Sequence, residues 1–139
     1  MSEYSIVKSV FIKAPSSDVW RFLTDKKKLA TWFHEGEDDV SESGVYALLS
    51  DSPDKAGTRL IWGQVLEFTP TSRLVHTFTH DSLAGIETTC VWELTDVEGG
   101  TILRLTHSGF EKADNGFNQA ADHDAGWDEH FARLRQQAN

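Results

Sequence analysis

The residues of this chain with the most versatile side-chain chemistry are six histidines. His107 has the alternation phase of Leu103 and Leu105, which predicts that its ring points toward the interior of a sheet. His76 has the same relation to Phe78. A buried neutral imidazole donates a hydrogen bond from one nitrogen and accepts one at the other, so either ring could orient a hydroxyl or carbonyl of a ligand. The alternative is a histidine held by hydrogen bonds within the protein, which is the more common outcome.

The other histidines do not predict a metal site. His80 falls beside the turn that follows its strand, where solvent should reach it. His123 and His130 lie seven residues apart on one face of a predicted helix, with Asp124 between them. Helical zinc ligands usually stand four residues apart, and a separation of about 10 Å along the axis prevents two rings from sharing one ion. No dinucleotide or phosphate-binding motif occurs, so we expect neither a metal nor any other cofactor.

Few other side chains suit catalysis. Cys90 shares a strand face with Trp92, and nothing beside it in the sequence would stabilise a thiolate, so it should be a small buried residue. Glu67 lies in a predicted strand, Arg59–Phe68, whose inward face the sequence leaves open. An interior Glu67 with a raised pKa would be the best general acid, whereas an exposed glutamate is more common. The acidic run 35–39 should be a solvated loop, not a calcium site.

Aromatic residues make up 11% of the chain. Flat rings that line a concave sheet leave gaps, and apolar pockets with aromatic walls are common ligand sites. The alternative is that the rings fill the core and leave no space. We predict a ligand pocket lined by Trp32, Phe33, Trp62, His76, Phe78, Trp92, Leu105, His107, Phe110, Trp127 and Phe131.

Hydrophobic periodicity predicts the elements that would position these residues. Alternation predicts a first strand over Tyr4–Lys13, and helical spacing then predicts two short helices, one ending near Thr24 and one over Lys26–Phe33. Five further strands, separated by short turns, are expected over Gly44–Ser50, Arg59–Phe68, Leu74–His80, Ile86–Thr95 and Thr101–Ser108. These short connections favour an antiparallel sheet.

The C-terminal segment returns to helical spacing. Trp127, Phe131 and Leu134 recur at i, i+4 and i+7, which predicts a long helix with one apolar stripe on the sheet. Gly126 costs such a helix about 1 kcal/mol relative to alanine. We therefore expect a close backbone approach at Gly126, or a break between two helical pieces.

Length and charge set the broad class. A chain of 139 residues has room for one domain, spanning residues 1–139. The net charge of −9 repels phosphate backbones and anionic membranes, so neither nucleic-acid binding nor membrane insertion is expected. The N-terminus has no basic stretch followed by an apolar run, and one cysteine allows no internal disulfide. We expect a cytoplasmic protein, and the sequence leaves its oligomeric state open.

Several separate stretches occur in the order found in a known superfamily: Phe11–Pro15, Val19–Trp20, Leu29–Phe33, Gly63–Glu67, Arg73–Val75, Gly100–Phe110 and Gly126–Trp127. On these residues the chain resembles the START-like, helix-grip (SRPBCC) superfamily along nearly its whole length. Within it, the chain is most similar to the family of homologues of the activator of the heat-shock protein 90 ATPase. The resemblance implies an α+β fold: a curved antiparallel sheet wrapped around a long C-terminal helix, two short helices after the first strand, and an apolar cavity between sheet and helix.

Three functions are compatible with this resemblance. The favoured one is binding of a small apolar or amphipathic ligand, of lipid, polyketide or aromatic type, in an enclosed cavity of roughly a few hundred Å³. The second is a cyclase, dehydratase or hydrolase, which requires two convergent ionisable groups, such as His107 with Glu67 or His76. The third is a co-chaperone of heat-shock protein 90. It is the least favoured, because this chain has no room for the N-terminal client-contacting domain of the true activators.

Overall fold

A computed structural model describes residues 4–42 and 44–139 of the chain, and in these ranges it contains six strands and three helices. The strands are β1 (Ile6–Ile12), β2 (Val45–Leu49), β3 (Arg59–Thr69), β4 (Arg73–Phe78), β5 (Thr88–Val97) and β6 (Gly100–Ser108). The helices are α1 (Ser16–Thr24), α2 (Lys26–Trp32) and α3 (Gly116–Ala138), with single 3-10 turns η1 (Asp81–Leu83) and η2 (Phe110–Lys112). No helix in the described ranges is both long and apolar enough to cross a membrane.

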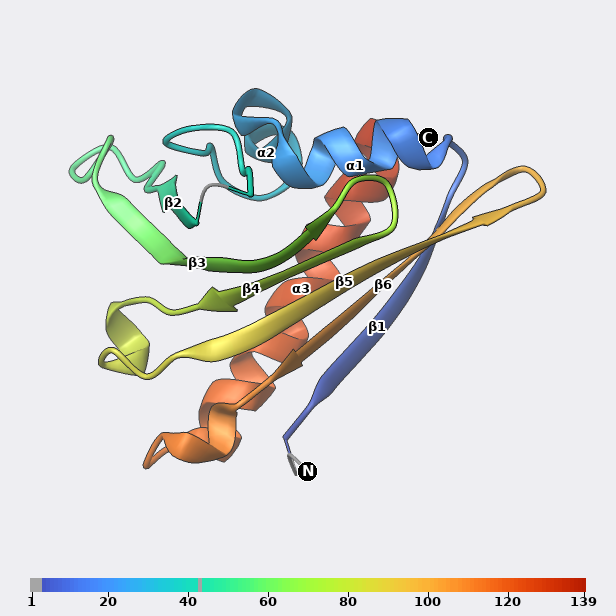
Figure 1. Cartoon of the computed structure of the whole chain (residues 1–139). Helices are drawn as coiled ribbons and strands as arrows, with labels where there is room; N and C mark the ends of the chain where they lie inside the picture. The colour runs from blue at the N-terminus through green and yellow to red at the C-terminus, as the bar shows by residue number, and fades with distance from the viewer. Residues whose placement is uncertain (1–3, 43) are drawn as a thin grey trace.

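The strands form one antiparallel sheet in the order β1-β6-β5-β4-β3-β2. Figure 1 shows this sheet curving along one side of α3, with α1 and α2 packed across one end. The α+β helix-grip architecture predicted from the sequence is therefore confirmed.

The concave face of the sheet carries the core. Alternation works as predicted along β6, where Leu103, Leu105 and His107 are fully buried while Arg104 is exposed. The apolar stripe of α3 lies against these side chains, and Trp127 is only 3% exposed. Burial of this stripe stabilises the helix more than local propensity does, since the hydrophobic effect dominates helix packing.

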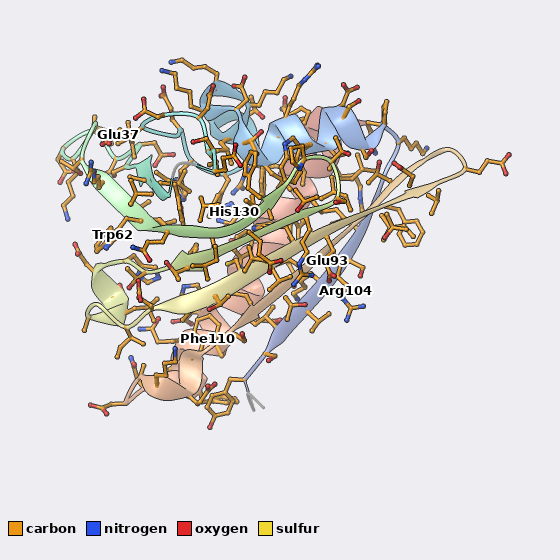
Figure 2. The ribbon with its side chains drawn as sticks, in the orientation of Figure 1. Glu37, Trp62, Glu93, Arg104, Phe110 and His130 are labelled. Carbon is orange, nitrogen blue, oxygen red and sulfur yellow. The ribbon has the colours of Figure 1, made fainter. Side chains whose placement is uncertain are left out.

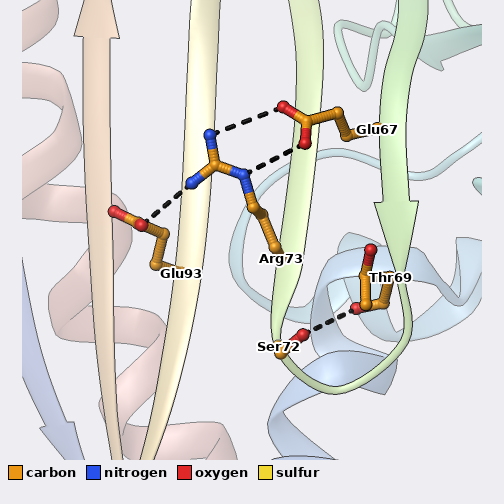
Figure 3. Close-up of polar contacts among 5 residues, drawn as sticks. All are labelled: Glu67, Thr69, Ser72, Arg73 and Glu93. Carbon is orange, nitrogen blue, oxygen red and sulfur yellow. Dashed lines mark hydrogen bonds and ion pairs between the residues drawn. The ribbon is translucent and has the colours of Figure 1, made fainter.

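The convex face carries Glu67, whose direction the sequence left open. Arg73 contacts Glu67 at 3.3 Å and Glu93 at 2.9 Å (Figure 3). Glu93 in turn lies in register with Arg104 on the next strand (Figure 2). The β3–β4 register shifts between Val65 and Glu67, so strict alternation fails there. Glu67 is thus an exposed glutamate and not an interior acid.

Two sequence predictions need correction at element boundaries. The strand expected over Leu74–His80 ends at Phe78, and the strand expected from Ile86 begins at Thr88. The reason is local: the Thr79 hydroxyl donates to the Ile86 carbonyl at 2.7 Å, which closes the connection that contains η1.

The prediction for Gly126 is also wrong. Helix α3 runs without a break from Gly116 to Ala138. A Cβ at Gly126 would meet nothing within 4 Å, so no backbone approaches closely either. The glycine instead leaves open space beside the helix.

Candidate functional site

The enclosed space between sheet and helix is small. Its volume is about 30 Å³, enough for about two water molecules. The expected enclosed cavity of a few hundred Å³ is therefore wrong, and the alternative, in which rings fill the core, describes this region. Six of the predicted pocket residues surround the space: Trp32, Phe33, His76, Phe78, Trp92 and Trp127.

His76 is held within this core. The Trp92 indole N–H donates to His76 Nε2 at 2.9 Å, and His76 Nδ1 lies 2.9 Å from the Thr77 carbonyl. Because a carbonyl only accepts, Nδ1 carries the proton and Nε2 is the acceptor. Burial lowers the pKa of His76 to about 4, so the ring is neutral at physiological pH.

His107 is satisfied in the same way. The Trp127 indole N–H donates to His107 Nδ1 at 3.1 Å, and His107 Nε2 lies 2.7 Å from the Thr88 hydroxyl. That hydroxyl donates to the Phe78 carbonyl, so it accepts from His107. Burial, with the nearby His123, places the pKa of His107 well below its usual value. The ring is neutral as expected, but neither nitrogen is free to orient a ligand.

A larger space opens beside this core. It is a groove of about 430 Å³ between α3, η1, the start of β3 and the residues after α2. Its apolar walls are Phe33, Leu60, Ile61, Phe78, Gly126 and Trp127, and its polar ones are His34, Lys55, His80, Asp81, Ser82, Asp122, His123 and His130. We call it the histidine groove.

Two histidines at one end of the histidine groove share a hydrogen bond. His80 Nε2 and His123 Nε2 are 2.8 Å apart, and His123 Nδ1 lies 2.6 Å from the Gln119 carbonyl. Burial and the neighbouring His123 lower the pKa of His80 to about 4, although the carboxylate of Asp81 acts to raise it. Burial also lowers the pKa of His123, although the hydrogen bond to the Gln119 carbonyl and the charge of Asp122 act to raise it. Both rings are therefore neutral near pH 7.

The other end of the histidine groove holds His34 and His130 (His130 is labelled in Figure 2). Arg133 donates to His130 Nδ1 at 2.6 Å, which leaves the proton of this neutral ring on Nε2. Burial, followed by Arg133 and His34, lowers the pKa of His130 to about 4. His34 Nδ1 is the one side-chain polar atom in the described ranges that is buried without a hydrogen-bond partner.

The remaining predicted pocket residues lie elsewhere. Leu105, Phe110 and Phe131 are core residues that border neither space, and His107 lies behind Trp127. Trp62 is half-buried on β3, opposite Ala47 and bridged through its backbone to Thr79 (Figure 2). Its neighbours Leu60 and Ile61 reach the groove instead.

Catalytic pairs of the kind predicted do not form. Glu67 faces away from His107, and the hydrogen bonds of His76 and His107 are used within the core. Cys90 is fully buried, and burial raises its pKa well above the usual value, so it is an inert thiol as expected. No group of three potential metal ligands occurs in the described residues.

The sequence did not single out the histidine groove. His80 has the strand phase of His76 and Phe78, and this was a usable signal despite the adjacent turn. The sequence did not indicate that His80 would contact His123, because this contact depends on where α3 crosses the sheet.

With this geometry in view, comparisons with known proteins identify the family. The model of the family described as Activator of Hsp90 ATPase homolog 1-like protein matches residues 13–139. This chain belongs to that family. The resemblance stated from the sequence is thereby confirmed, and the chain is an SRPBCC domain of this type. Among curated proteins, no sequence matches the chain.

Solved structures share the fold at low sequence identity. A Mesorhizobium loti protein has a TM-score of 0.79 and 22% identity, over 95% of this chain and 94% of its own. DynU16, from the dynemicin biosynthetic locus, has a TM-score of 0.76 and 22% identity, over 96% of this chain and 46% of its own. The Aha1 dimer from Colwellia psychrerythraea has a TM-score of 0.74 and 19% identity, over 96% of this chain and 95% of its own. Such identities show the fold alone.

Proposed function

We propose that this chain binds a small apolar or amphipathic molecule in the histidine groove. The observation that carries the proposal is a space of about 430 Å³ that combines aromatic walls with four imidazole rings. Ligand sites of small molecules usually span roughly 300–1,000 Å³ and join apolar walls to a few placed polar groups. The ligand site proposed from the structure therefore lies beside the collapsed core and not inside it.

The unpartnered nitrogen of His34 favours a ligand over an empty groove. A buried polar atom without a partner costs roughly 1–3 kcal/mol. Because Nδ1 is buried, the His34 ring must turn toward the groove before a ligand or an ordered water can complete the hydrogen bond and recover that cost. His34 is neutral at physiological pH because burial lowers its pKa. It therefore suits a hydroxyl or carbonyl better than a charged group.

The walls favour an aromatic or polycyclic ligand over a flexible chain. Phe33 and Trp127 stand with their ring centroids 5.1 Å apart, and Phe78 and Trp127 with theirs 6.2 Å apart. Flat rings present a large contact area at little cost in conformational entropy. The relative DynU16 comes from a biosynthetic locus, which is consistent with a small-molecule role in this fold.

Two other functions have less support. Catalysis by the pairs predicted from the sequence fails on geometry, as described above. A co-chaperone role rests on the family description alone. Nucleic acid remains an unsuitable partner for a chain with a net charge of −9.

Tryptophan fluorescence tests the proposal, because Trp127 lines the groove. A panel of flavonoids, steroids and fatty acids should contain ligands that quench saturably with micromolar affinity, as is plausible for ligands of this size. Gly126→Leu should abolish that response, since its side chain would occupy the open space beside α3. Gly126→Ala, with a single added methyl, is the matched control and should retain binding. A flat response across the panel would contradict the proposal.

A further inference from the structure

Because both rings of the His80–His123 pair are neutral, the geometry of their hydrogen bonds places their protons. His123 Nδ1 faces the Gln119 carbonyl at 2.6 Å, and a carbonyl only accepts, so the proton of neutral His123 sits on Nδ1. His123 Nε2 is then an acceptor. At 2.8 Å from it, His80 Nε2 must be the donor. The proton of neutral His80 is therefore on Nε2, and its Nδ1 carries a free lone pair.

Solvent reaches that lone pair. His80 Nδ1 has no hydrogen-bond partner among the described residues. Among these residues only His34 Nδ1 is both unpartnered and buried, so the unpartnered Nδ1 of His80 must be accessible to solvent. His80 also lines the histidine groove. The groove thus offers one oriented acceptor nitrogen, fixed in its tautomer by a second histidine and a backbone carbonyl. This is the role that a supporting shell usually has in a ligand site.

The surroundings determine what can donate to this acceptor. Asp81 and Asp122 line the same end of the groove, so an anionic ligand would meet negative charge. Lys55 is the one cationic side chain among the described residues of the lining, against two carboxylates, and His34, His123 and His130 are neutral. The aromatic walls favour a ligand with an aromatic ring, and the lone pair of His80 Nδ1 requires a hydrogen-bond donor. An aromatic hydroxyl is uncharged, carries a ring and donates a hydrogen bond, so it meets all three conditions.

Resting on the proposed function, we infer that the histidine groove selects hydroxyaromatic molecules in their neutral form, with the hydroxyl donating to His80 Nδ1. His80 is the specificity-determining residue, and His123 is a positioning residue that fixes its tautomer. Neutral His80 is too weak a base to take the phenolic proton, because its pKa is about 4 and that of a phenol is near 10. The proton therefore stays on the ligand.

A matched pair of probes tests this inference without any variant. Near pH 7.5, 2-naphthol is neutral because phenolic hydroxyls titrate near pH 10, and 2-methoxynaphthalene has the same rings without a donor. Calorimetric titration should show 2-naphthol binding about fivefold to tenfold more tightly, the effect of one hydrogen bond. Hydrophobicity alone would favour the methyl ether, so tighter binding of 2-naphthol could not be explained by apolar contact and would require the hydroxyl.

Two substitutions then locate the acceptor. His80→Phe keeps an aromatic ring but removes the lone pair, so it should abolish the preference while both probes still bind. His80→Asn places an amide oxygen near the position of Nδ1 and should retain a preference. Equal binding of the two probes to the natural chain, or a preference that survives in His80→Phe, would overturn the inference and leave the proposed function standing. Binding of neither probe would count against both.

Discussion

Two tryptophan indoles in the core each donate to a histidine: Trp92 to His76 and Trp127 to His107. A buried indole N–H needs an acceptor, and a neutral imidazole supplies one while its other nitrogen donates elsewhere. The sequence placed both histidines on the inward face by strand phase. It could not name their partners, because these lie on a neighbouring strand and on α3.

The His107 network makes a prediction about stability. His107→Phe removes the acceptor for Trp127 and the donor to Thr88, so it should lower the free energy of unfolding by about 1–3 kcal/mol. Because neither nitrogen of His107 faces the groove, ligand affinity should not change. Urea denaturation and a fluorescence titration of the same variant test both parts. If the variant were as stable as the natural chain but bound ligands more weakly, His107 would have to contact the ligand, contrary to this prediction.

Buried neutral histidines also predict sensitivity to acid. Because the pKa of His76 is lowered from 6.5 to about 4, the unfolded chain binds more protons than the folded one between these values. The free energy of unfolding should fall as the pH drops from 6.5 to 4, by up to about 3 kcal/mol from His76.

His76→Gln is the matched variant for this effect. Its amide oxygen can still accept from Trp92, but it does not titrate. Urea denaturation across this pH range should give a shallower loss of stability than in the natural chain. Identical pH dependence in the two proteins would show that His76 is not the titrating group.

At the scale of elements, periodicity predicted the number, type and order of strands and helices, because one face of each is buried. It failed where local hydrogen bonds override the pattern, as at Thr79 and at the register shift after Val65. The histidine groove could not be predicted, because it forms between elements far apart in sequence. Strand phase put His80 on the face of His76, but the adjacent turn led us to expect a solvated ring, and nothing in the sequence indicated that His123 would contact it.

Gly126 lies in α3 and lines the histidine groove. Gly126→Ala should raise the free energy of unfolding by about 1 kcal/mol, since the methyl meets no neighbour and alanine favours the helix. Thermal or urea denaturation measures this change. A destabilised variant would mean that the space beside α3 is filled.

Considered as a whole, the molecule closes its core and leaves a groove at one edge of it. Rings from α2, β4, β5 and α3 reduce the enclosed space to about 30 Å³. The far edge of the sheet is held to the helix by Lys8, which pairs with Asp124 and Asp128 at 2.9 Å each. The convex face carries ion pairs such as Arg73 with Glu93. The groove beside α3 is the part of the surface best built for a small ligand.

The most direct test of that claim is NMR mapping of a bound aromatic probe on the uniformly ¹⁵N-labelled chain. Titration with 2-methoxynaphthalene, which needs no hydrogen bond to His80, should shift the amide signals of residues 81–83 and 122–130 and the Trp127 indole signal saturably. Signals from the exposed Val7 and Phe11 on β1 should stay unchanged. Shifts confined to β1 and the convex face, or no saturable shift up to about 1 mM, would contradict a ligand site in the histidine groove.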